Sequence, residues 1–225
     1  MTEEPAVAHD RHVLFAIFGF AASILSVVLL LGSLQPPPPT PADVLSFATS
    51  HRSGMGMFAT LALAWAVFSV PLAFILGRLF YRQGQTLATI AQFLVSVGVL
   101  LLGFANFIRI GAVLSIAAAG SPPQSVDAIY QVAIWSSLGY YLTDPGLMTW
   151  GLGQLIFGVL AWRSGVLPNW VAAVGFLGGV AGLLTLAVYQ TGVLALLQLC
   201  CFAVWGFAAG IVMLRSRHTP SQRSA

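Results

Sequence analysis

This chain has very little charge and no lysine. It holds 9 arginines and 6 carboxylates in 225 residues, so 7% of it is charged, against about 25% in soluble domains. The missing lysine excludes lysine-based covalent chemistry such as a Schiff base. So few basic residues cannot form the clustered basic face that nucleic acid requires. We therefore expect membrane lipids to cover most of the surface.

Cysteine and catalytic motifs are equally scarce. The two cysteines, Cys200 and Cys201, are neighbours inside an apolar run, where a disulfide between them would be strained. We interpret them as small buried hydrophobic residues. The chain contains no nucleophile elbow and no zinc-protease, phosphate-loop or CxxC motif. We therefore expect no catalytic residues, no metal site and no cofactor, which makes an enzyme the least favoured class.

Long apolar runs make up most of the chain instead. Hydrophobic residues account for 58% of it, and the mean hydropathy is +0.91. Because about 20 apolar residues cross the roughly 30 Å hydrocarbon core as a helix, we predict an all-α, polytopic transmembrane bundle. The six expected spans are residues 12–34, 55–77, 86–119, 147–162, 170–189 and 193–214. The third of these runs is too long for the bilayer, so it must tilt, break or project from the membrane.

Residues 126–142 are more polar than the spans and rich in tyrosine. Their apolar residues favour one face of a helix, Ser125 can cap its first turn, and the Asp144–Gly146 turn should end it. This profile is typical of an amphipathic helix that lies in the membrane interface. We predict one such helix, external and separate from the spans, over residues 125–144.

The arginines predict the orientation. If residues 126–142 do not span, one side of the membrane holds Arg11, Arg78, Arg82, Arg163, Arg215, Arg217 and Arg223, and the other holds Arg52 and Arg109. Because basic residues concentrate on the cytoplasmic side, six spans with both termini cytoplasmic are favoured. The chain then divides into a cytoplasmic tail (1–12), a six-span domain (13–214) with an external loop (35–54), and a second cytoplasmic tail (215–225). We expect it in the plasma (inner) membrane.

Polar and aromatic residues on the external face form the candidate ligand site. An ionised group at the edge of a span must be paired or reach water. Arg109 can therefore hold an anionic head group, form an ion pair with Asp127 or Asp144, or extend into external water. The candidate ligand-binding residues are Arg109, Asn106, His51, Arg52, Trp135, Tyr140, Tyr141 and Asp144.

The last two expected spans contain glycines four residues apart. The pairs are Gly175 with Gly179, Gly178 with Gly182, and Gly206 with Gly210. This spacing allows two helix backbones to approach closely. We predict that these glycines pack the last two spans against each other within one chain, with homodimerisation as the alternative.

A short internal repeat is also visible. The segment that begins Trp65-Ala-Val-Phe-Ser and reaches Arg78 aligns with the one that begins Phe202-Ala-Val-Trp-Gly and reaches Arg215. The offset is constant at 137 residues (202 − 65 and 215 − 78). Apolar helices also match by chance, which is the alternative. A true repeat would favour a transporter-like architecture.

One stretch of the chain carries a family resemblance. Residues 160–170 read Leu-Ala-Trp-Arg-Ser-Gly-Val-Leu-Pro-Asn-Trp and lead into a glycine-rich run from Gly175 to Leu184. This stretch resembles a bacterial family of six-span membrane proteins known as a domain of unknown function, in which a Tyr-Arg-Ser-x-Leu-Leu-Pro-Arg-Trp turn joins two late spans. Here Trp162 replaces the tyrosine and Asn169 the second arginine. The resemblance implies a six-span fold and assigns no activity.

Two classes of function remain open. The first is binding or transport of a small apolar or amphiphilic ligand, in a cavity that opens outward at the candidate site. The alternative is a non-catalytic subunit or assembly factor of a larger membrane complex, bound to another membrane protein or to a second copy of itself. A transporter should have a polar cavity that reaches the middle of the bilayer. A subunit should have a tightly packed interior and a large apolar or aromatic surface patch.

Overall fold

The computed structural model is all-helical over the residues it describes, which are 5–33, 40–120, 122, 124–185 and 191–215. The helices are α1 (Pro5–Ser33), α2 (Pro41–Ser50), α3 (Arg52–Phe80), α4 (Gln85–Ala118), α5 (Val126–Ser164), α6 (Asn169–Leu184) and α7 (Thr191–Arg215). Three of them, α3, α4 and α7, are long and apolar enough to cross a membrane, and α1 and α6 contain shorter apolar helical stretches. The chain is therefore a membrane-embedded helical protein.

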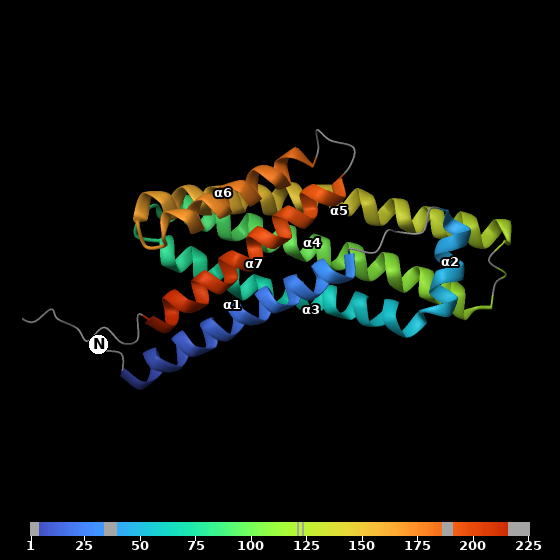
Figure 1. The fold of residues 1–225 in the computed structure, drawn as a ribbon, viewed down its shortest axis with the longest axis horizontal. Coiled ribbons are helices and arrows are strands. Elements are labelled where there is room, and N and C mark those ends of the chain that lie inside the picture. Colours follow the sequence, from blue (N-terminus) through green and yellow to red (C-terminus); the bar gives the residue numbers. More distant parts are fainter. Residues whose placement is uncertain (1–4, 34–39, 121, 123, 186–190, 216–225) are drawn as a thin grey trace, which may run out of the picture.

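Six of these helices form a closed ring in chain order, and α2 lies outside it. Each of α1, α3, α4, α5, α6 and α7 packs against the next, and α7 closes the ring against α1. Neighbouring helices run in opposite directions, so the first and last described helices begin and end at the same end of the bundle (Figure 1). Arg78, Arg163 and Arg215, in the last turns of α3, α5 and α7, lie at that end too.

Aromatic side chains of α3, α5 and α7 fill the centre of the ring. Trp65, Trp150 and Phe202 form a triangle whose ring centroids are 5.1–6.2 Å apart, the distance at which aromatic pairs attract. Each of the three residues precedes the arginine in the last turn of its helix by 13 positions (78 − 65, 163 − 150 and 215 − 202). The α5 segment is thus a third copy of the pattern that α3 and α7 share.

A second aromatic triangle fills the ring closer to the arginines. Phe80, Phe157 and Trp205 come from the same three helices, with ring centroids 6.0–6.5 Å apart. All three side chains are fully buried. In the first triangle, Nε1 of Trp65 donates a 2.8 Å hydrogen bond to Oγ of Ser26 on α1. The axis of the bundle is therefore packed with side chains from two successive layers.

The most extensive interface joins α4 to α5 in a seven-residue register. Three glycines of α5 face larger side chains of α4: Gly139 faces Arg109, Gly146 faces Leu102, and Gly153 faces Val95. A Cβ on any of these glycines would lie 3.0 Å or less from the facing side chain. A repeat of seven keeps one face of a helix against its partner over many turns. The two helices can therefore stay together along their whole shared length.

This register explains why one prediction was wrong. Residues 126–142 are not a separate interfacial helix, and the Asp144–Gly146 turn does not end it, because α5 runs unbroken from Val126 to Ser164. Pro145 cannot donate a backbone hydrogen bond to Tyr141, but Pro145 lies on the exposed side of the helix. The glycine face of α5 packs against α4 on both sides of Pro145. This packing keeps the two halves of α5 in one straight helix.

The long helices α4 and α5 extend past α1, α6 and α7 at the end opposite the described termini (Figure 1). With 34 and 39 residues, α4 and α5 are about 51 and 58 Å long, and they reach beyond α6 and α7 (Figure 1). The short helix α2 lies across them there. Its buried residues Leu45 and Ala48 join a second hydrophobic core with Val113 and Ile116 of α4 and Ala128 and Val132 of α5. We call α2 with residues 106–118 and 126–142 the extension.

Candidate functional site

Arg109 lies where the extension joins the bundle, and three residues hold its side chain. Its Nη2 donates a 3.1 Å hydrogen bond to Oδ1 of Asn106. Its guanidinium carbon lies 5.5 Å from the centre of the Tyr140 ring, close enough for a cation–π interaction. Its aliphatic carbons cover Gly139. The structure thus brings two of the predicted site residues, Asn106 and Tyr140, against a third, the partly buried cation of Arg109.

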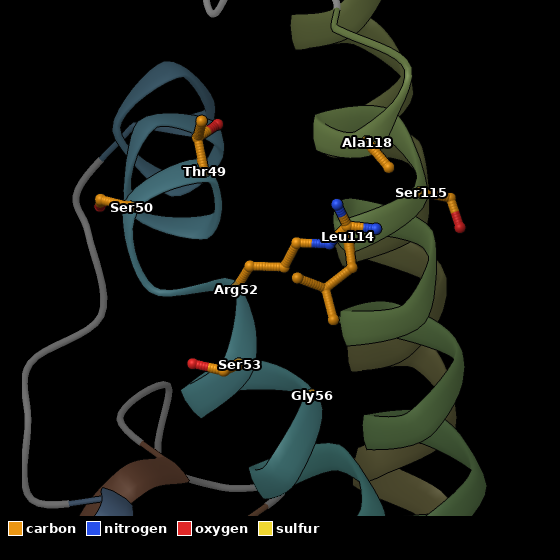
Figure 2. Close-up of a pocket in the computed structure, with 8 residues that line it drawn as sticks. All are labelled: Thr49, Ser50, Arg52, Ser53, Gly56, Leu114, Ser115 and Ala118. Atoms are coloured by element: carbon orange, nitrogen blue, oxygen red, sulfur yellow. The ribbon is translucent and has the colours of Figure 1, made fainter.

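His51 and Arg52 lie at the junction of α2 and α3. The Arg52 side chain reaches from α3 towards Leu114 of α4 (Figure 2) and lines an open depression of about 700 Å³ at the surface. The ring of His51 stacks on Phe47 with centroids 4.3 Å apart, and its Nδ1 lies 2.9 Å from Oγ of Ser50. Arg52 therefore faces an open surface, whereas the His51 side chain contacts residues of α2.

The remaining three candidates join neither group. Asp144 is partly buried, and among the described residues no ion pair links it or Asp127 to Arg109, whose polar partner is Asn106. Trp135 and Tyr141 lie on the surface of α5, with 38% and 78% of their side chains exposed. The eight predicted residues are thus distributed over three places and do not line one cavity.

An apolar stripe on the outer half of α5 is the feature that the sequence interpretation missed. It consists of Val126, Tyr130, Ile134, Leu138 and Tyr141, and all five side chains are at least 40% exposed. Residues three or four positions apart lie on one face of a helix, so the stripe is continuous. The spacing is visible in the sequence. In a helix lying flat in the interface, lipid would cover these side chains. The spacing alone therefore did not predict that this face of α5 is left exposed. We call this set the α5 stripe.

Three of the six paired glycines bring α6 or α7 close to a helix other than the expected one. A Cβ on Gly179 would lie 2.6 Å from Cα of Leu155, so the backbone of α6 approaches α5. A Cβ on Gly206 would lie 2.9 Å from the carbonyl oxygen of Gly19, so α7 approaches α1. Gly210 lies beside the Phe20 ring of the same helix α1. Gly179, Gly206 and Gly210 therefore face helices other than the ones we expected.

Between α6 and its neighbours, three of these glycines accommodate large side chains. Gly175 faces Trp205 and Gly182 faces Gln198, both on α7, and Gly178 faces Gln154 of α5 and Cys201 of α7. These three glycines therefore pack the last two helices against each other, as predicted. Nε2 of Gln198 donates a 3.2 Å hydrogen bond to the carbonyl of Leu147. Neither polar atom of the Gln154 amide has a hydrogen-bond partner, although this side chain is only 2% exposed. The interior near α6 thus contains an amide whose burial is not compensated.

The fold and these surfaces define a membrane-embedded helical bundle with an extension at one end. Within that class, the chain belongs to the family described as a domain of unknown function (DUF4386), whose model matches residues 13–194. This match confirms the predicted resemblance to a family of unknown function and includes every predicted ligand-site residue. No curated protein and no solved structure matches the chain.

Proposed function

We propose that this chain is a non-catalytic subunit or assembly factor of a larger membrane complex. It crosses the plasma membrane six times, through α1 and α3 to α7, and both termini are cytoplasmic. The extension stands outside, and the α5 stripe binds a second membrane protein. The α5 stripe is the observation that carries this proposal.

The arginines support this orientation. Arg78, Arg163 and Arg215 share one end of the bundle with the beginning of α1. Basic residues concentrate in the cytoplasmic segments that flank membrane spans. The end with the three arginines is therefore the cytoplasmic one, and the extension is on the external side.

The length of α5 carries its stripe out of the lipid. Counted from Arg163 at 1.5 Å per residue, Tyr141 lies about 33 Å and Tyr130 about 50 Å along the helix. The hydrocarbon core is about 30 Å thick, and the bilayer with its head groups about 40–45 Å. The stripe thus begins among the external head groups and continues into water. A contiguous apolar face exposed to water is typical of a protein interaction site.

A protein fits this surface better than a small ligand does. Two of its five residues are tyrosines, which are enriched at protein interfaces. The exposed polar residues Asp127 and Gln131 flank the stripe, as expected for the polar rim of an interface. The stripe begins at the membrane surface, so its partner must also rise from the membrane. We therefore assign a membrane protein with an external apolar surface as the partner.

The filled axis favours a subunit over a transporter. Two aromatic layers occupy the centre of the ring, so a path for a ligand would require both layers to separate. The residues expected to surround an outward cavity, such as Arg109, Arg52 and Tyr141, lie at different places. A tightly packed interior together with an exposed aromatic surface is what we expected of a subunit.

Native mass spectrometry of the protein, extracted gently from its own membrane, tests the proposal. We expect a second, different polypeptide at fixed stoichiometry. This polypeptide should be lost when Tyr130→Glu and Ile134→Glu place carboxylates on the α5 stripe. It should be retained in Ser46→Glu, which adds a carboxylate to the exposed surface of α2. A bare monomer, a homodimer, or a complex that survives the double substitution would overturn the proposal.

A further inference from the structure

An apolar groove runs along α7 between α1 and α6. Both of these helices pack against α7 but not against each other, so a strip of α7 stays uncovered. The groove has a volume of about 1140 Å³, and its walls include Ile24 and Val27 of α1, Trp170 and Val171 around the start of α6, and Phe207 and Ile211 of α7. Small-molecule sites measure roughly 300–1,000 Å³. The groove is therefore large enough for an elongated molecule.

The length of the groove matches one leaflet of a bilayer. It extends along α7 from Ala203 to Arg215, which is about 18 Å at 1.5 Å per residue. Half of the hydrocarbon core is about 15 Å thick. Arg215 is the last residue of α7, so that end of the groove lies at the membrane surface. The other end lies beside the aromatic layer that contains Phe202, near the middle of the membrane.

The positive charge at the mouth of the groove favours a lipid with an anionic head group. Among the described residues that line it, Arg215 is the only charged one, and none is acidic. A guanidinium can bind a phosphate through two parallel hydrogen bonds. The amine of a zwitterionic lipid would find no carboxylate among these described lining residues. Trp170, which is 61% exposed, lies at the same end, as tryptophan commonly does at the membrane interface.

We propose that this groove is a binding site for an anionic phospholipid of the adjacent leaflet. Its phosphate is bound by Arg215, and its acyl chains lie along α7 towards the middle of the bilayer. This site is on the opposite membrane face from the α5 stripe. It therefore holds whether or not a protein partner binds the extension.

Native mass spectrometry of the detergent-purified protein tests the site with two defined lipids. Phosphatidylglycerol and phosphatidylcholine with identical acyl chains are titrated separately. We expect the protein to retain phosphatidylglycerol about fivefold more, the factor that corresponds to about 1 kcal/mol for one basic residue at an anionic surface. Arg215→Gln should abolish this preference. Arg163→Gln, on the same membrane face but outside the groove, should keep it.

A groove-filling variant tests the position of the acyl chains. Ala208 lines the groove on α7, so Ala208→Phe should reduce retention of both lipids several-fold. If circular dichroism shows that Ala208→Phe misfolds, the result for Arg215→Gln, at an exposed residue, decides the question alone. Equal retention of the two lipids by the unaltered protein would overturn the proposal. So would an equal loss in Arg163→Gln, because the attraction would then belong to the whole basic face.

Discussion

Replacing Gly179 by alanine should force α5 and α6 apart. The added Cβ would lie 2.6 Å from both Cα and the backbone nitrogen of Leu155. Carbon atoms make ordinary contact at about 3.5–4.0 Å, so the two backbones must separate by about 1 Å. Backbone atoms cannot move away as a flexible side chain would. Overpacking of a well-packed interior costs about 1–3 kcal/mol, and we expect a destabilisation of that size.

Gly111→Ala is the matched control for this substitution. Gly111 is also inside a helix, and a Cβ there would meet no atom within 4 Å. Alanine gains about 1 kcal/mol over glycine from helix propensity in both variants, so their difference isolates the steric cost. Thermal unfolding in one detergent, followed by far-UV circular dichroism, measures this difference. We expect Gly179→Ala to melt about 2–12 °C below Gly111→Ala, at about 2–4 °C per kcal/mol for a chain of this size. Equal melting temperatures would refute the close approach of α5 and α6.

Two further substitutions test the interior by the same unfolding assay. Gln154→Met should leave the melting temperature unchanged or raise it, because a buried amide without a hydrogen-bond partner costs about 1–3 kcal/mol; a clear drop would mean that the amide does have a partner. Pro145→Ala should stabilise the protein by up to about 3 kcal/mol, because it restores a backbone donor inside the continuous helix α5. A lower melting temperature in Pro145→Ala would indicate that the chain needs a break there.

The helical architecture was predictable from composition and run length. A backbone in lipid must satisfy its hydrogen bonds internally, so each apolar run had one accessible structure. The 34-residue run at 86–119 illustrates this, because it is one helix, α4, at Gln85–Ala118. Its length also indicated that it must tilt, break or project from the membrane, and α4 contains no break. A span count follows less directly, since α1, α5 and α6 fall short of the length or apolarity of α3, α4 and α7.

The continuity of α5 was not predictable from local signals. Pro145 and Gly146 are residues that commonly end helices, so the sequence favoured a stop. The outcome depends on Gly139, Gly146 and Gly153, which are seven residues apart and fit the surface of α4. That spacing is present in the sequence. It acquires meaning only when the facing helix and its register are known, because the stabilisation is tertiary.

The candidate site was predictable only where its contacts are local in the sequence. Arg109 and Asn106 stood out because polar groups are rare in membrane spans, and their proximity follows from their spacing of three on one helix. The contact with Tyr140 depends on the register between α4 and α5. Which face of α5 remains exposed depends on how α2 covers the extension. Neither arrangement is encoded in a local pattern.

A distance measured along α5 tests most directly whether one unbroken helix connects the stripe to the arginine end of the bundle, as the docking surface requires. Spin labels at Tyr130 and Trp162, both exposed, would be introduced after Cys200 and Cys201 are replaced by alanine, and their separation measured by pulsed electron spin resonance in lipid nanodiscs. An unbroken helix over these 32 positions (162 − 130) predicts about 48 Å. A helix broken at Asp144, with its outer part lying flat at a right angle, has arms of about 21 and 27 Å and predicts about 34 Å. A distance near 48 Å would support the external docking surface, and one near 34 Å would contradict it.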